Sequence, residues 1–180
     1  VDGKSITMEE DVQFAHYDPN VASLMQLGKW FDYMRENGVY DNKRIILVAD
    51  HGRGLYLNWD RVIDNGPDTD FFFPLLMVKD FNAKGFSFSD TFMTTADVPT
   101  LATSGLIDNP TNPFTGNAIN ANAKYDRPFY AFMSYDWDTS KNNGNQFFPG
   151  TWYRVDNQNA RDKRNWVMVG ENTVLPDALR

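Results

Sequence analysis

The sequence has no cysteine in its 180 residues, which excludes disulfide bonds, cysteine-ligated zinc and thiol catalysis. No apolar run approaches the roughly 20 residues that a membrane-spanning helix needs, and we expect no signal peptide at Val1. Lys and Arg are scattered without a basic run, and the formal net charge is -7 with a pI near 4.7. We therefore expect no nucleic-acid partner.

What is present is the composition of a globular domain, with 42% hydrophobic and 15% aromatic residues. This length supports one packed core and is too short to expect two. We expect a single domain over residues 1–180, with helix–strand units in 1–117 and a β-rich part in 118–180. Because the chain opens at Val1 without a Met, we expect it to be a piece of a longer protein.

A helix is predicted in the stretch "HYDPNVASLMQLGKWFDYMRENG". Asp18 is a suitable cap, Pro19 suits the first helical position, and Gly38 suits the end. Gly28 lies on the apolar stripe, where a missing side chain would let the helix approach a sheet closely. The apolar members of that stripe are Val21, Leu24, Met25, Phe31 and Met34.

The stretch "KRIILVADHGRG" runs from an apolar segment directly into polar residues. Ile45 to Ala49 is too short for a helix and too continuously apolar for a strand with one wet face, which indicates a strand buried on both sides of a parallel sheet. The apolar run Phe71 to Val78 is predicted to lie beside it. Asp50 and His51 then follow the first strand at its carboxyl end, where open α/β sheets bind ligands.

The remaining chain predicts a short helix and a small sheet. A helix from about Val98 to Ser104 is indicated by Asp97 as its cap and by a proline in its first turn. Residues 109–126 are rich in Asn, Pro and Gly and predict a surface loop. The stretches "RPFYAFMSYDWD", "GTWYRVDN" and "NWVMVGEN" predict three strands of an antiparallel meander.

Several of these stretches together resemble a known family. "FDYMRENGVYDNKRIILVADHG" resembles the segment of the sulfatase and alkaline-phosphatase superfamily in which a helix, a G-x-YDN turn and an apolar strand end in Asp-His-Gly. "FFPLLMVKDF" resembles the next core strand of that superfamily, and "TTADVPTLATSGLIDNP" resembles its D-x-x-PT-L-x-x-x-G helix. The resemblance is greatest to the lipoteichoic-acid-synthase-like and phosphoethanolamine-transferase-like branch, covers about residues 18–117, and is specific because three elements recur in order.

This resemblance implies an α/β fold: part of an alkaline-phosphatase-like sheet with flanking helices, followed by the antiparallel meander. It implies a divalent metal ion, Mn, Mg, Zn or Ca, for which Asp50 and His51 would be ligands. The metal would activate a Thr, Ser or formylglycine nucleophile that attacks phosphorus or sulfur.

Two features depart from the family pattern. The nucleophile and the remaining acidic ligand of the family lie upstream, on strands that this sequence does not contain, so no catalytic nucleophile is assigned here. Many relatives also carry another histidine shortly after Asp-His-Gly, whereas "RGLYLNWD" has none. Arg53 is then the candidate cation for a phosphate or sulfate oxygen.

Each candidate residue also has a purely structural interpretation. His51 could be a histidine satisfied by backbone at a strand end, Arg53 could be a solvated loop residue, and His16 could belong to the start of the helix instead of contacting substrate. The cluster Asp64, Asp68 and Asp70 suggests calcium, but its spacing misses the EF-hand loop, so a surface turn is favoured. Structural roles are also the simplest for Lys79 and Thr100, and packing is favoured over sugar stacking for Trp137, Trp152 and Trp166.

The sequence therefore predicts the carboxyl-terminal part of a metal-dependent sulfatase-like enzyme. Its parent would transfer a phosphoryl or sulfuryl group, as a phosphoglycerol transferase or sulfatase does, on an anionic phosphodiester or sulfate ester. The parent would be anchored at the extracytoplasmic face of a bacterial membrane, and the fragment alone would be inactive. An exposed sheet edge would favour self-association. The alternative is a non-catalytic cell-surface module, such as a glycan-binding one, derived from this fold.

Overall fold

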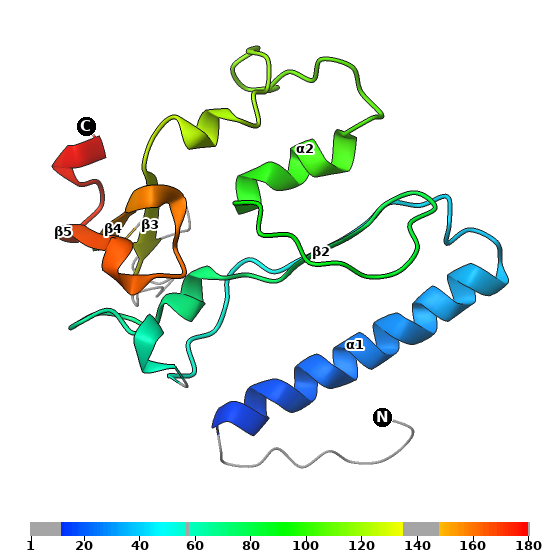
Figure 1. Cartoon of the computed structure of the whole chain (residues 1–180), viewed down its shortest axis with the longest axis horizontal. Helices are drawn as coiled ribbons and strands as arrows, with labels where there is room; N and C mark the ends of the chain where they lie inside the picture. Colours follow the sequence, from blue (N-terminus) through cyan, green and yellow to red (C-terminus); the bar gives the residue numbers. More distant parts are fainter. Residues whose placement is uncertain (1–11, 57, 135–147, 180) are drawn as a thin grey trace. The chain divides into compact units, whose positions relative to one another are not determined.

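The computed structural model describes residues 12–56, 58–134 and 148–179 (Figure 1). These residues belong to two compact units, the first comprising residues 12–49 and 75–89 and the second residues 50–74 and 90–179. The chain therefore leaves the first unit directly before Asp50 and returns to it directly after Pro74. Within this described part, no helix combines the length and the apolar character that crossing a bilayer requires.

The first unit begins with the helix α1 (Val12–Glu36). The predicted start at Asp18 and Pro19 is wrong, because both residues lie inside the helix. A helix can tolerate an internal proline at the loss of one backbone hydrogen bond. The predicted end is confirmed: Gly38 has φ +66°, its amide donates to the Arg35 carbonyl at 3.0 Å, and the Val39 amide donates to the Met34 carbonyl at 2.9 Å. This is the Schellman arrangement that favours glycine.

The apolar stripe of α1 is only partly covered. Met34, near the end of the helix, is buried, whereas Leu24 and Met25 are about half exposed. A Cβ atom placed on Gly28 would have no atom within 4 Å. The close approach to a sheet that was predicted at Gly28 is therefore not found among the described residues.

The first unit contains a two-stranded sheet of β1 (Ile45–Val48) and β2 (Leu76–Lys79). The strands are antiparallel, with Ile45 opposite Lys79 and Val48 opposite Leu76, so the prediction of a parallel pair is wrong. Parallel neighbours need a long crossover connection, usually a helix. The described residues between the two strands, 50–56 and 58–74, form 3₁₀ turns and an isolated bridge but no α-helix, and the chain returns in the opposite direction. The prediction of burial on both faces is also wrong, since Val48 and Val78 are exposed.

Lys79 holds the turn that joins α1 to β1. Its ammonium group donates to the carbonyl oxygens of Tyr40, Asp41 and Lys43, the last at 2.9 Å. The same group lies 4.4 Å from the centre of the Tyr40 ring. Three charge-assisted hydrogen bonds satisfy every donor of the ammonium group. Lys79 therefore links the G-x-YDN turn to the end of β2.

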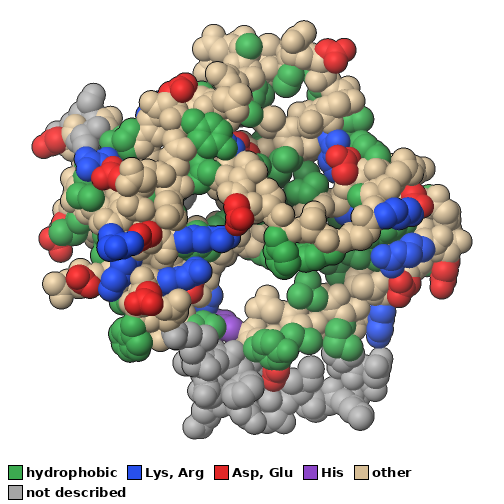
Figure 2. Space-filling view, in the orientation of Figure 1, with side chains coloured by type: hydrophobic (Ala, Val, Ile, Leu, Met, Phe, Trp, Pro, Cys, Tyr) green, Lys and Arg blue, Asp and Glu red, His purple; other side chains and the backbone are tan. Residues whose placement is uncertain are grey.

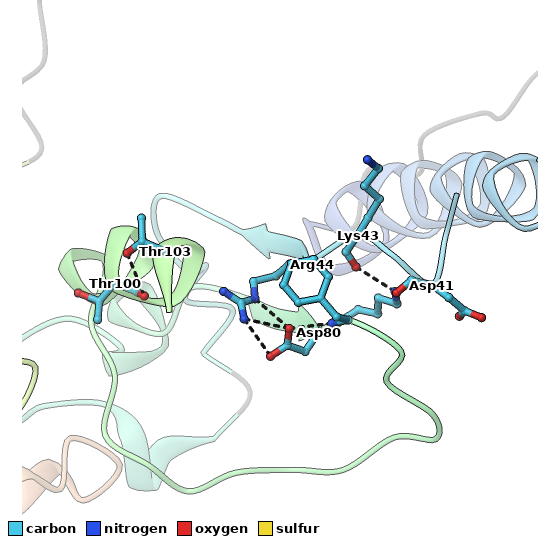
Figure 3. A network of polar contacts seen from close by, with 8 residues as sticks. Asp41, Lys43, Arg44, Asp80, Thr100 and Thr103 are labelled. Atoms are coloured by element: carbon cyan, nitrogen blue, oxygen red, sulfur yellow. Dashed lines mark hydrogen bonds and ion pairs between the residues drawn. The ribbon is translucent and has the colours of Figure 1, made fainter. Parts of the chain in front are cut away.

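Arg44 and Asp80 form a second link between the beginning of β1 and the end of β2 (Figure 3). The Arg44 Nε atom donates to Asp80 Oδ1 at 3.0 Å, and Nη2 donates to Oδ2 at 3.2 Å. The guanidinium also lies over the Phe81 ring. The hydrogen bond from Arg44, with a further one from the Phe81 amide, holds the pKa of Asp80 below its usual value. A bidentate pair of this kind sets orientation as well as distance.

The second unit contains the sheet β3 (Phe129–Met133), β4 (Gly150–Val155) and β5 (Trp166–Thr173). All neighbours in this sheet are antiparallel and follow chain order, which confirms the predicted meander. Its buried residues are Ala131, Tyr153, Val155 and Trp166, and Phe72 packs against them with its ring centre 4.9 Å from that of Trp166. Phe72 thereby fastens residues 50–74 to the meander.

The predicted short helix is confirmed as α2 (Val98–Thr103), which follows the 3₁₀ turn η3 (Thr95–Asp97). Thr100 is half-buried, and its carbonyl accepts hydrogen bonds from the Ser104 amide and the Thr103 hydroxyl, as Figure 3 shows for the latter. Both of its contacts are structural. The other one-turn 3₁₀ segments are η1 (Trp59–Arg61), η2 (Thr69–Phe72), η4 (Ala123–Tyr125), η5 (Asp156–Gln158), η6 (Lys163–Asn165) and η7 (Asp177–Leu179).

Replacing Lys79 by Met should destabilise the first unit. We expect its free energy of unfolding to fall by about 2 kcal/mol, because the carbonyls of the turn lose a charged donor. Lys84 is the matched control: its ammonium group forms an exposed ion pair with Asp41 at 3.0 Å, so Lys84→Met should cost no more than about 0.5 kcal/mol. Amide hydrogen exchange of β1 and β2 measures both effects, and equal protection in the two variants would contradict the role of Lys79.

Candidate functional site

The Asp-His segment, defined here as residues 50–56, begins where the first sheet ends. The last hydrogen bond of that sheet joins the Ala49 amide to the Leu75 carbonyl at 3.0 Å. Asp50 and His51 follow immediately, and their side chains are 89% and 68% exposed. Both side chains are therefore free to reach a ligand from solvent.

Asp50 and His51 are arranged by short local hydrogen bonds. The His51 amide donates to Asp50 Oδ1 at 2.9 Å. The His51 Nδ1 atom lies 2.7 Å from the Gly52 carbonyl oxygen, and because a carbonyl can only accept, a neutral His51 carries its proton on Nδ1. The unprotonated Nε2 atom then lies 3.8 Å from Asp50 Oδ1.

This pair fits two corners of a metal site. Two ligands that each lie about 2.1 Å from one ion are separated by roughly 3 to 4 Å, depending on the angle at the metal. A histidine whose Nδ1–H is held by a carbonyl presents Nε2 in the form that binds metals. Within the described ranges, however, no group of three or more His, Cys, Asp or Glu side chains could hold a metal ion. A metal held here needs further ligands.

Gly52 brings the Asp-His segment against the turn η2. Its amide donates to the Phe71 carbonyl at 2.9 Å. A Cβ atom on Gly52 would lie 2.0 Å from the Asp70 carbonyl oxygen and 2.6 Å from that of Phe73. Only glycine fits at this backbone-to-backbone contact.

Arg53 is exposed, and its guanidinium lies 5.8 Å from the centre of the Phe71 ring. No carboxylate of the described chain forms an ion pair with it, whereas Arg61 close by is paired with Asp70 at 2.6 Å. Its guanidinium donors are therefore available to an anion.

His16 lies inside α1, in the first unit, and its carbonyl accepts a hydrogen bond from the Asn20 side chain at 2.6 Å. It lies inside the helix, whereas the sequence predicted that the helix starts only after it, at Asp18 and Pro19.

The three aspartates that suggested calcium have separate partners. Asp64 forms an exposed ion pair with Lys163 at 3.3 Å, and Asp70 pairs with Arg61. Asp68 is fully buried, and its two oxygens accept from backbone amides. The turn interpretation therefore holds for this segment, but the turn is partly buried instead of lying wholly at the surface.

The tryptophans of the meander are mostly packed. Trp166 is buried in the core, and its indole N–H donates to the Ala160 carbonyl at 2.8 Å. Trp152 is half-buried, packs against the Phe132 ring in a tilted arrangement with 4.8 Å between ring centres, and donates to the Thr173 carbonyl. Trp137 lies outside the described residues. Packing and hydrogen bonding account for both described rings.

A buried ion pair that the sequence did not predict stabilises the beginning of α2. Lys124 Nζ lies 2.9 Å from Asp97 Oδ1, and both side chains are largely buried. Asp97 Oδ2 accepts from the Thr94 amide at 2.7 Å and from the Thr94 hydroxyl at 3.1 Å. Asp97 thus occupies the predicted cap position, but its carboxylate bonds backward to Thr94. Nothing in the local sequence links Lys124 to Asp97.

Charges on the visible surface are mixed. Figure 2 shows Lys and Arg side chains next to Asp and Glu side chains, together with many hydrophobic ones.

Comparison of the chain with protein-family models, with curated proteins and with solved structures found no significant match.

Gly52→Ala should destabilise the second unit. We expect a loss of about 1 to 3 kcal/mol, because a methyl group at this position collides with two backbone carbonyls. Gly28→Ala is the control, since that position has open space around it and helix propensity favours Ala by up to about 1 kcal/mol. Urea denaturation followed by tryptophan fluorescence compares the two, and a tolerated Gly52→Ala would mean that the segment does not contact η2.

Asp97→Asn should make the stability of the second unit depend less on pH under acidic conditions. Burial by itself raises the pKa of Asp97, but the hydrogen bonds from Thr94 and Lys124 together outweigh burial and leave this pKa below its usual value. The stability from Asp97 is therefore present above its unfolded pKa of about 3.9 and is lost as pH falls through the lower folded value.

In thermal melts from pH 6 to pH 2, the Asn variant should start less stable and lose less than wild type. The control is Asp90→Asn, which removes an exposed carboxylate that lies 3.4 Å from Arg161. It should retain the wild-type pH dependence. A wild-type slope in Asp97→Asn would contradict the assignment.

Proposed function

We propose that this chain supplies part of the metal site of a phosphoryl- or sulfuryl-transfer enzyme of the sulfatase and alkaline-phosphatase superfamily. The observation that carries the proposal is the geometry of Asp50 and His51. His51 Nε2 and Asp50 Oδ1 are 3.8 Å apart, exposed, and oriented by backbone contacts. Two ligands of different chemistry at that spacing suit a divalent cation.

Arg53 supports an anionic substrate for this site. It lies two residues from His51, is exposed, and forms no ion pair with a carboxylate of the described chain. A guanidinium can bind two oxygens of a phosphodiester or sulfate ester side by side. We assign Arg53 to substrate binding, and we retain His16 as a second candidate for that role.

The residues of this chain would bind and orient, and would not attack. A bound divalent metal would activate a hydroxyl nucleophile and screen the charge of the transferring group. The nucleophile and the further ligands would come from a longer parent chain. We place that parent, by resemblance, at the extracytoplasmic face of a bacterial membrane. The substrate would be a phosphodiester or a sulfate ester.

The same proposal concerns the first sheet. In the described chain, β1 and β2 pair only with each other, and their residues Val48, Met77 and Val78 are exposed. We propose that both strands belong to a larger alkaline-phosphatase-like sheet in the parent. Without it, their unpaired edges would favour self-association of the isolated chain.

Metal binding to the chain tests the proposal directly. Mn²⁺ should broaden the NMR resonances of His51, and Asp50→Asn and His51→Gln should each weaken Mn²⁺ binding at least about tenfold, since even outer-sphere substitutions cost that much. Asp64→Asn removes an exposed carboxylate elsewhere in the same unit and should bind as wild type does. Equal Mn²⁺ binding by the wild type and the three variants would contradict the metal site and favour the alternative, a non-catalytic binding module.

Turnover separates the fragment from its parent. We expect the 180-residue chain to hydrolyse neither a chromogenic phosphodiester nor a sulfate ester, and the longest soluble form of the parent to hydrolyse one of them only with Asp50 and His51 intact. Metal-dependent turnover by the fragment itself would contradict the assignment of the nucleophile to the parent.

A further inference from the structure

Asp68 is a buried carboxylate with an unusual set of partners. It is 0% exposed. Its Oδ1 atom accepts from the Asp70 amide at 3.0 Å, and its Oδ2 atom accepts from the Tyr56 amide at 2.9 Å. No Lys, Arg or His of the described chain forms an ion pair with it. Burying a charge without a cation is costly, so its two backbone hydrogen bonds are what retain it there.

One of these bonds holds a strained residue. Tyr56 has φ +55°, a conformation that non-glycine residues rarely adopt. Tyr56 is the last residue of the Asp-His segment, and its amide is bound by Asp68. Such strain persists where surrounding contacts determine the backbone, and it is concentrated at functional sites.

The other bond ties Asp68 to a fixed part of the unit. Asp68 caps η2 through the Asp70 amide, and Phe72 of the same turn packs into the core of the meander. Gly54 lies directly on this turn, because a Cβ atom there would be 2.9 Å from the Asp68 Cβ and 2.5 Å from the Phe71 ring. One carboxylate therefore connects the Asp-His segment to the packed core.

The segment is held at two points as a result. Gly52 binds the Phe71 carbonyl near its beginning, and Asp68 binds Tyr56 at its end. His51 precedes the first of these points directly, and its imidazole is held by the Gly52 carbonyl. We therefore expect a shift of the segment to change the orientation of the His51 ring and the distance between His51 Nε2 and Asp50 Oδ1.

We propose that Asp68 is a positioning residue that holds the Asp-His segment so that Asp50 and His51 can bind one divalent cation together. The inference rests on the proposed function for its ligand. Asp68 does not contact the ion; it acts through Tyr56 and η2. Outer residues that orient metal ligands typically change affinity 10- to 100-fold when they are replaced.

The experiment compares the whole chain with Asp68→Asn, which keeps the shape but leaves a single acceptor oxygen for two amides. Val155→Ala is the stability-matched control, because it opens the core of the same unit without touching the segment. Three readouts are taken by NMR: exchange of the Tyr56 amide, the ¹⁵N shifts of the His51 ring, and broadening of His51 by Mn²⁺.

In Asp68→Asn we expect Tyr56 exchange to accelerate at least tenfold, the His51 ring to lose its preference for the Nδ1–H form, and Mn²⁺ binding to weaken at least tenfold. Val155→Ala should retain the His51 tautomer and the Mn²⁺ affinity. Wild-type Mn²⁺ affinity in Asp68→Asn, with or without a change at Tyr56, would overturn the positioning role.

Two further results need their own interpretation: a variant that does not fold, and a wild-type protein that does not bind Mn²⁺. If Asp68→Asn does not fold, the wild-type protein decides: a Tyr56 amide that exchanges at the rate of an open loop overturns the proposal, and a protected one supports it. If Mn²⁺ leaves wild-type His51 unchanged, the proposed metal function fails. The Tyr56 exchange and the His51 tautomer in Asp68→Asn then decide alone whether Asp68 positions the segment.

Discussion

The missing side chain at Gly52 is the constraint on which the candidate site depends. At that residue the backbone of the Asp-His segment touches the carbonyls of Asp70 and Phe73, and no Cβ atom would fit between them. This contact holds the backbone directly after Asp50 and His51, whose side chains are then arranged by their own local hydrogen bonds. A site built on a loop is exact only when the loop is held in this way by neighbouring backbone.

The charged residues fall into two classes, buried carboxylates and exposed ion pairs. Asp68 and Asp97 are buried, and each connects segments that are distant in sequence, because a buried carboxylate must be hydrogen-bonded. Pairs such as Arg164 with Asp162 lie close together in sequence and largely at the surface, where they contribute little to stability, although hydrogen bonds from Arg164 lower the pKa of Asp162 to about 2. Asp50, His51 and Arg53 belong to neither class. They are exposed; the polar contacts of Asp50 and His51 are with each other and with Gly52, and Arg53 forms no ion pair with a carboxylate of the described chain.

Local signals predicted the elements whose form depends on a few adjacent residues. The glycine that ends α1 was identified because a positive φ is easy only for glycine, and α2 was identified by its proline and cap. The meander was recognised because three stretches rich in aromatic and β-branched residues are separated by turn-forming residues, a pattern in which neighbouring strands pair in chain order. The start of α1 was missed, since a proline also fits inside a long helix whose other hydrogen bonds are intact.

The sequence by itself identified the candidate site residues: an aspartate and a histidine directly after an apolar strand, followed by an arginine between two glycines. It also contained the G-x-YDN turn, but nothing in that pattern showed that Lys79 would bind the carbonyls of the turn. Only the tertiary structure decided that β1 and β2 are antiparallel, that Asp68 holds Tyr56, and that Lys124 pairs with Asp97. Strand pairing and burial depend on contacts between residues far apart in the chain, and a local pattern contains no information about which distant group will meet it.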